Sequence, residues 1–169
     1  IEHSEELVNR LEEENVPLFL SGHLHVQHYM RNEEDRGIYE IVTSSLSTPP
    51  CQYGVLEYRD DESFSYHTQQ VDMEKWARKH KSTDENLLNF NTYAPAALRT
   101  IFYNQSYDAM KDSEEEETGD LFVKLTQRQK EQMSEVYAQL NAACYGGKAY
   151  EVVKEATTTP AYKMWQEYC

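Results

Sequence analysis

The sequence has 169 residues, which is enough for one domain with a hydrophobic core. Its 30 acidic residues against 16 basic ones give a net charge of −14, which argues against broad binding to nucleic acid or to an anionic membrane surface. No run of residues approaches the roughly 18 apolar positions of a membrane span.

The first 25 residues predict a helix, a short strand and a loop that contains histidines. Ser4 is a good helix N-cap, and apolar residues at helical spacing follow it. Pro17 stands after the helix, and Leu18-Phe19-Leu20 is typical of a short buried strand. One helix–strand step of this kind belongs to a layered α/β fold, in which sites lie at the carboxyl ends of strands.

The next part of the chain predicts β-structure. Strand-like runs cover residues 26–30, 37–46, 53–60 and 63–72 and are separated by turn residues. Their spacing favours an antiparallel meander or the edge of a sandwich, with a hairpin that turns at Asp60-Asp61. So few strands leave unpaired edges, and residue 1 is not Met, so we expect further strands upstream in a longer protein.

From residue 73 onward the pattern is helical. We expect helices over 73–81 and 83–111, the second interrupted near Pro95, and an acidic loop over 112–120. Thr126 and Gln129 form a capping box for a further helix that ends at Gly146-Gly147. Two shorter helices follow, the last of which starts at Thr159-Pro160. The side chains that have helical spacing for the core of the capped helix are Met133, Val136, Tyr137 and Leu140.

The three cysteines, Cys51, Cys144 and Cys169, are scattered along the chain. They make neither a disulfide framework nor a spaced zinc site. Reduced thiols in a cytoplasmic protein are the simplest interpretation.

The segment Gly22-His23-Leu24-His25 directly follows the predicted strand. In an extended segment residues i and i+2 point to the same face, so both imidazoles can enter one cleft. Neutral imidazole is a good ligand for Zn, Fe or Mn, and one imidazole on each ion suits two metals about 3.5–4 Å apart. A His-x-His pair can also be incidental, and a one-metal sensor built on His23, His25 and His28 is a further alternative.

Together with the preceding helix and strand, this segment resembles the last motif of the calcineurin-like metallophosphoesterases, Gly-His-x-His after an apolar strand. The resemblance implies an αββα sandwich, with residues 1–72 as the C-terminal portion of that core and 73–169 as a helical extension. It also implies two divalent metal ions (Mn, Fe or Zn), one bound by His23 and the other by His25. Metal-activated water would then hydrolyse a phosphomonoester or phosphodiester.

The family's other metal ligands come from upstream motifs that this sequence lacks. The resemblance therefore implies that the partners are a phosphoester substrate and an upstream part of the same protein, and that this chain alone is inactive. A different function class remains open. The tyrosine-containing helices over 83–168 suit a partner-binding or assembly module in which the His-x-His pair is incidental.

Overall fold

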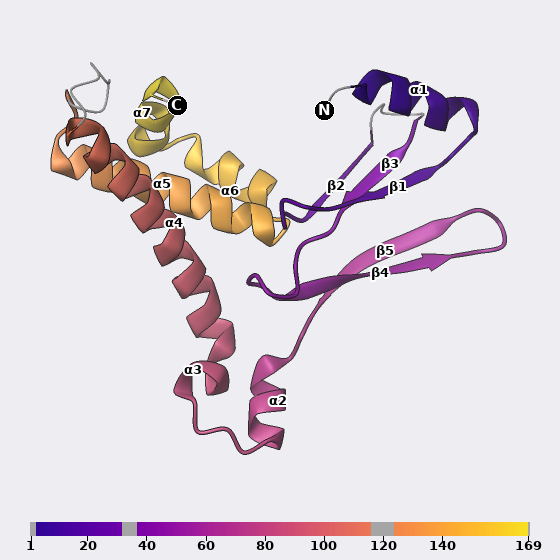
Figure 1. The fold of residues 1–169 in the computed structure, drawn as a ribbon, viewed down its shortest axis with the longest axis horizontal. Coiled ribbons are helices and arrows are strands. Elements are labelled where there is room, and N and C mark those ends of the chain that lie inside the picture. The colour runs from indigo at the N-terminus through magenta and orange to yellow at the C-terminus, as the bar shows by residue number, and fades with distance from the viewer. Residues whose placement is uncertain (1–2, 32–36, 116–123, 169) are drawn as a thin grey trace.

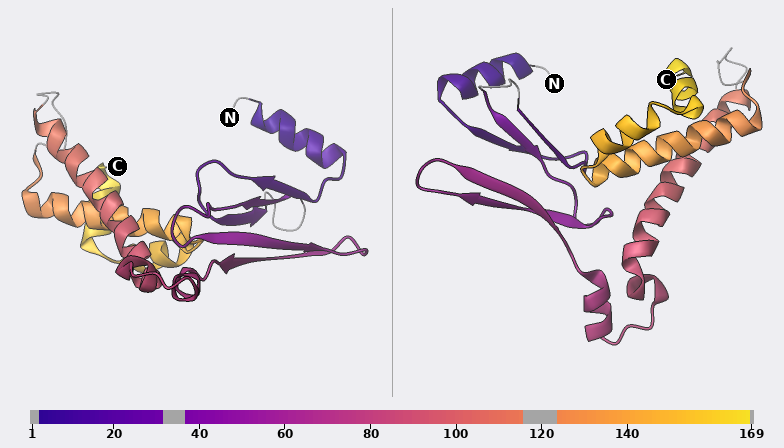
Figure 2. Two further views of the ribbon diagram at one scale, coloured as in Figure 1. Left: turned by 60° about the horizontal axis from the view of Figure 1, so that its bottom comes forward. Right: turned by 180° about the vertical axis from the view of Figure 1, so that it is seen from behind.

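The computed structural model describes residues 3–31, 37–115 and 124–168. Over these residues the chain is a mixed α+β protein with seven helices and two small sheets (Figure 1). Helix α1 (Ser4–Glu13) and the strands lie on one side of the molecule, and the long helices lie on the other (Figure 2). The α+β class is confirmed, whereas the described residues do not show the αββα sandwich that was expected.

The first sheet combines parallel and antiparallel pairing. It contains β1 (Leu18–Ser21), β2 (His28–Arg31) and β3 (Tyr39–Val42) in the order β1-β3-β2. The strand β3 pairs parallel with β1 and antiparallel with β2, so it separates the two strands that precede it. The expected antiparallel meander is therefore wrong for this sheet. The central strand carries Ile41, which is completely buried.

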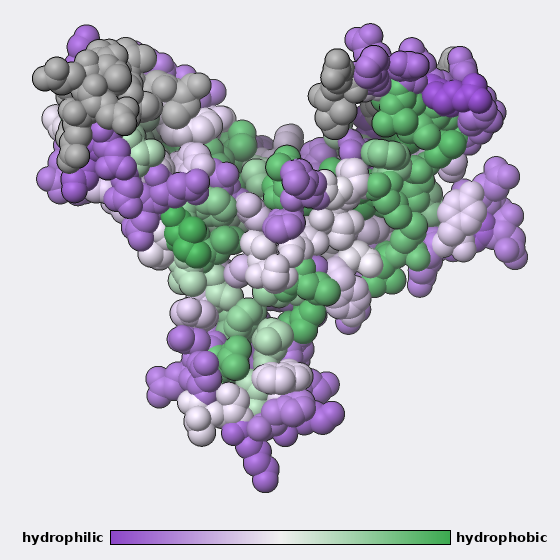
Figure 3. Space-filling view, in the orientation of Figure 1, coloured by the Kyte–Doolittle hydropathy of each residue, from purple (hydrophilic) through white to green (hydrophobic). Residues whose placement is uncertain are grey.

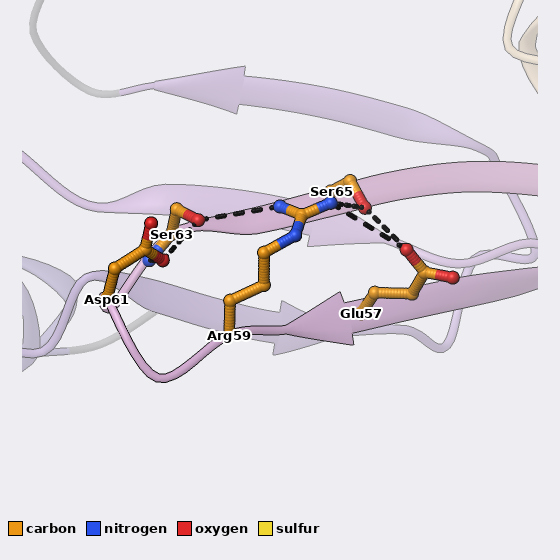
Figure 4. Close-up of polar contacts among 5 residues, drawn as sticks. All are labelled: Glu57, Arg59, Asp61, Ser63 and Ser65. Atoms are coloured by element: carbon orange, nitrogen blue, oxygen red, sulfur yellow. Dashed lines mark hydrogen bonds and ion pairs between the residues drawn. The ribbon is translucent and has the colours of Figure 1, made fainter.

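The second sheet is the hairpin of β4 (Gln52–Tyr58) and β5 (Phe64–Gln70). Its turn lies where Asp60-Asp61 predicted it. The Asp61 carboxylate accepts hydrogen bonds from the hydroxyl of Ser63 at 2.6 Å and from its backbone N–H at 3.1 Å (Figure 4). These hydrogen bonds hold the pKa of the Asp61 carboxyl below its usual value, and the bond from the Ser63 hydroxyl has the largest effect.

Among the described residues, six helices follow the hairpin. They are α2 (Met73–Lys79), α3 (Glu85–Leu88), α4 (Phe90–Glu115), α5 (Gln127–Tyr145), α6 (Ala149–Ala156) and α7 (Pro160–Tyr168). The expected interruption near Pro95 is wrong, because α4 runs through this residue and the break falls at Asn89 instead. Proline has no backbone N–H, so α4 lacks one internal hydrogen bond at Pro95. Ala94 and Leu98, which lie near Pro95 in the helix, are buried, and their packing offsets this loss. The acidic loop expected over 112–120 begins inside α4, and its later part lies outside the described residues.

The capping box at the start of α5 is confirmed. The Thr126 backbone N–H donates to Gln129 Oε1 at 2.9 Å, and the Gln129 N–H donates back to Thr126 Oγ1 at 3.3 Å. Such a reciprocal cap stabilises a helix by about 0.5–2 kcal/mol. The predicted start of the last helix is confirmed as well, because the Tyr162 N–H donates to Thr159 Oγ1.

Apolar packing among α4, α5, α6 and α7 makes the helical core. One cluster joins Met110, Leu125 and Met133, and a second joins Val136, Ala156 and Tyr162. The indole of Trp165 packs against both clusters. The predicted inward face of α5 is confirmed for Met133 and Val136, which are buried, while Tyr137 and Leu140 are half-buried.

The strand side of the molecule buries much less. Helix α1 contains no buried residue, and its N-cap is His3, which makes no side-chain capping bond, so the expected cap at Ser4 is wrong. Hydrophobic residues gather on the surface over the sheets beneath α1 (Figure 3). Leu20, on the edge strand β1, is 57% exposed. Over the described ranges, no helix combines the length and the apolar character needed to cross a bilayer.

Gly147 lies at a close contact between the helical region and Gln27. Its φ is +71°, and a Cβ built there would lie 3.0 Å from Cγ of Gln27. We expect Gly147→Ala to lower the free energy of unfolding by at least about 1–2 kcal/mol, because the left-handed backbone penalises a side chain and the space is filled. Urea unfolding measures this change.

The neighbouring Gly146 gives a matched control. Its φ is −88°, and an added Cβ would meet Ala143 O at an ordinary 3.7 Å. Gly146→Ala should therefore change the free energy of unfolding by less than about 1 kcal/mol. Equal losses in the two variants would contradict the close packing assigned to Gly147.

Candidate functional site

The two histidines of the Gly-His-x-His segment lie in the loop between β1 and β2. Since β1 and β3 are parallel, their carboxyl ends lie at the same edge of the first sheet. The N–H of Thr43 donates to Ser21 O at 3.1 Å and joins the two strand ends directly below the loop. His23 and His25 are therefore mounted at a fixed sheet edge, as the sequence predicted.

The backbone of this loop is not the extended segment that the sequence suggested. Strand β1 ends at Ser21, and the φ angles of His23 and His25 are +102° and +60°. Left-handed backbone at a non-glycine residue costs about 1–3 kcal/mol, and such residues are enriched at functional sites. The alternation argument that placed both imidazoles on one face is therefore wrong, because it requires a regular strand.

Both imidazoles are exposed, and neither has a hydrogen bond or an ion pair with another described residue. This suits ligands that bind a group from outside the chain. Two nitrogen donors do not complete a metal shell, however. Within residues 3–31, 37–115 and 124–168 there is no group of three or more His, Cys, Asp or Glu side chains that could hold an ion. The three-histidine sensor with His28 is therefore not supported.

The loop ends at Gln27, which is 9% exposed and connects four separate segments of the chain. Its backbone N–H donates to Cys144 O, at the end of α5, over 3.0 Å. Its side-chain Nε2 donates to the hydroxyl of Tyr66 on β5 at 2.9 Å. Its Oε1 accepts from the backbone N–H of Ser44, after β3, at 3.4 Å. The histidine loop is thus fixed to both sheets and to the helical region.

The carboxyl end of α5 is the second half of this junction. The last carbonyls of a helix lack partners inside the helix. Here Cys144 O accepts from Gln27 N, and Tyr145 O accepts from the side-chain Nε2 of buried Gln52 at 3.4 Å. Residues from the strands therefore satisfy the end of the long helix, and the contact sets the position of α6, which starts four residues later.

The ring of Tyr66 lies against Gly54 on the paired strand. A Cβ at Gly54 would stand 2.6 Å from the Tyr66 ring, so this close approach requires glycine. Beyond the ring, a pocket of about 370 Å³ opens between β2, β5 and the start of α6, and both His28 and His67 line it.

The two described cysteines are free thiols. Burial raises the pKa of Cys51 and also that of Cys144, which keeps both thiols protonated near neutral pH. A protonated thiol is a poor nucleophile. Neither thiol is therefore an activated nucleophile, and the interpretation of reduced thiols stays a prediction.

Sequence reasoning missed Gln27, Tyr66 and Gly147 as residues that shape the site. The sequence indicated Gly146-Gly147 only as the end of a helix, not as part of a site. The partners of Gln27 lie 17, 39 and 117 positions further along the chain, and no local pattern connects them.

A family model described as the C-terminal domain of cyclic nucleotide phosphodiesterase matches residues 72–169. No curated protein matches the chain.

This match corrects the resemblance to the calcineurin-like metallophosphoesterases. The matching family is a different one, and its range does not include Gly22-His23-Leu24-His25. The earlier inference rested on a four-residue motif with its flanking strands, and those strands form a different sheet order from the one expected. The link to phosphodiesterases holds, and it comes from the helical part of the chain.

The hydrogen bond between Gln27 and Tyr66 can be tested directly. Tyr66→Phe removes only the hydroxyl that accepts from Gln27 Nε2. We expect the free energy of unfolding to fall by about 1–3 kcal/mol, because a buried amide loses its partner. Tyr58→Phe is the control, since Tyr58 is 57% exposed on the same hairpin and should change stability by less than about 0.5 kcal/mol. A loss as small as that of the control would contradict the role of Gln27 as a connector.

Proposed function

Because the chain belongs to the family of the C-terminal domain of cyclic nucleotide phosphodiesterase, we propose that it is part of an enzyme that hydrolyses the phosphodiester bond of cyclic nucleotides. The family match over residues 72–169 is the observation that carries this proposal. The helical region then serves as the C-terminal domain of the enzyme. The loop at the carboxyl end of β1 provides groups at the reaction site.

His23 and His25 are the proposed reaction-site residues. Their support is a loop that is fixed at a sheet edge, left-handed backbone at both positions and imidazoles that have no described partner. Imidazole binds Mn, Fe or Zn, and one or two such divalent ions would activate water and stabilise charge on the phosphoryl oxygens. Since the described residues offer no third donor beside the pair, the remaining ligands are proposed to come from another part of the same protein.

The role of the histidine pair predicts a large and selective loss of activity. In the full-length protein, His23→Ala and His25→Ala should each lower phosphodiesterase activity by more than about 100-fold, since even the outer partners of metal ligands contribute 10- to 100-fold. The unfolding midpoint should stay close to that of the wild type, because both side chains are exposed. Assays with a cyclic nucleotide and a metal determination measure both effects.

His3→Ala is the matched control. His3 is also exposed, but it lies at the start of α1, where its Nδ1 stands 3.3 Å from Glu6. This variant should keep full activity. Wild-type activity and metal content in either loop variant would exclude the proposed role of the pair.

A second expectation follows from the number of ligands. The 169-residue chain alone should bind Mn²⁺ or Zn²⁺ weakly and should not hydrolyse a cyclic nucleotide, because two imidazoles without a bridging carboxylate do not hold two cations together. Isothermal titration with each ion, beside an activity assay on the same preparation, measures both properties. Tight binding of two ions with turnover would show that the chain contains a complete site.

A further inference from the structure

The pocket beside the histidine loop has walls from three elements. Gln27 and His28 form one side at the start of β2, Tyr66 and His67 form another on β5, and the third comes from the segment between α5 and α6. Its volume is about 370 Å³, within the range of small-ligand sites. Figures 1 and 2 show the end of α5 and the start of α6 beside the loop that follows β1.

The residues that line the pocket are aromatic, imidazole, amide or small, and no Lys, Arg, Asp or Glu is among them. In a protein of net charge −14, a pocket without Lys or Arg does not attract a phosphate group. The pocket suits a neutral and planar group instead, because aromatic rings bind such groups by stacking.

Two side chains in the pocket, those of Tyr66 and Tyr150, can orient a bound ring. The Tyr66 hydroxyl accepts from Gln27 Nε2, so its own proton is available to an acceptor atom of a ligand. Tyr150, in the first turn of α6, lines the pocket, and the residue is 82% exposed. A planar ring can therefore cover the face of Tyr150 while the Tyr66 hydroxyl donates to its edge. These are the contacts that a heteroaromatic base requires.

We propose that this pocket binds the base of the nucleotide substrate, with Tyr150 as the stacking residue. The inference rests on the proposed function, which puts the phosphodiester at His23 and His25. His28 follows His25 by three residues, so their Cα atoms are at most about 11 Å apart. A base in the pocket and a phosphodiester at the loop are thus within the span of one nucleotide. The C-terminal domain thereby determines which phosphodiesters bind.

The test uses the full-length protein and two substrates, a purine cyclic nucleotide and the corresponding cyclic ribose phosphodiester that lacks a base. Tyr150→Ala should raise KM for the cyclic nucleotide by about tenfold or more, because the variant loses one stacking contact with the base. The same variant should leave KM for the base-free substrate unchanged. Tyr150→Phe keeps the ring and should behave as the wild type. An unchanged KM for the cyclic nucleotide in Tyr150→Ala overturns the proposal.

Binding of adenosine separates this inference from the proposed function, because adenosine contains no phosphate. Saturation-transfer NMR should show contact of its base protons with the wild type and with Tyr150→Phe, but not with Tyr150→Ala. If the enzyme hydrolyses neither substrate and adenosine still shows this pattern, the proposed function fails and the pocket assignment stands. If cyclic nucleotides are hydrolysed but adenosine contacts all three proteins equally or none of them, the pocket assignment fails.

Discussion

The arrangement of the molecule depends on one buried amide. Gln27 uses its backbone N–H and both ends of its side chain to contact α5, β5 and the segment after β3. A buried amide without partners costs about 1–3 kcal/mol, so each of these contacts favours only one placement of the segments. Because Gln27 directly follows the histidine loop, the residue that unites the fold also fixes the carboxyl-terminal side of the proposed reaction site.

The two sides of the molecule are stabilised in different ways. The helical side has two apolar clusters that share Trp165, and burial of each large side chain there contributes about 1.5–3 kcal/mol. On the strand side, Ile38, Ile41 and Cys51 are the buried apolar residues among those described, and α1 buries none. Polar contacts such as those of Gln27 and Gln52 therefore matter most where apolar packing is thin.

The features that the sequence predicted are those encoded by neighbouring residues. The capping box of α5, its inward face at Met133 and Val136 and the hairpin turn at Asp61 all depend on residues a few positions apart. The features it failed to predict depend on distant ones. The parallel pairing of β1 with β3 passes over β2, and the continuity of α4 through Pro95 depends on tertiary packing. For the site, the position of the histidines at the carboxyl end of β1 was predictable. Their positive φ angles were not predictable, because glycine commonly adopts a positive φ and histidine rarely does, so the residue type gives no indication of it.

The link between the helical domain and the histidine loop has a mechanical consequence. The contacts that join them are short and directional, with backbone donation from Gln27 to Cys144 and close packing of Gly147 on the Gln27 side chain. A shift of the end of α5 relative to Gln27 would disturb both contacts. The start of α6 therefore cannot move independently of the loop, and a ligand that contacts both is held between parts whose separation is fixed. The residues that line this pocket include no acidic or cationic side chain, so in the proposed enzyme the helical domain would act by positioning the ligand rather than by adding charged groups.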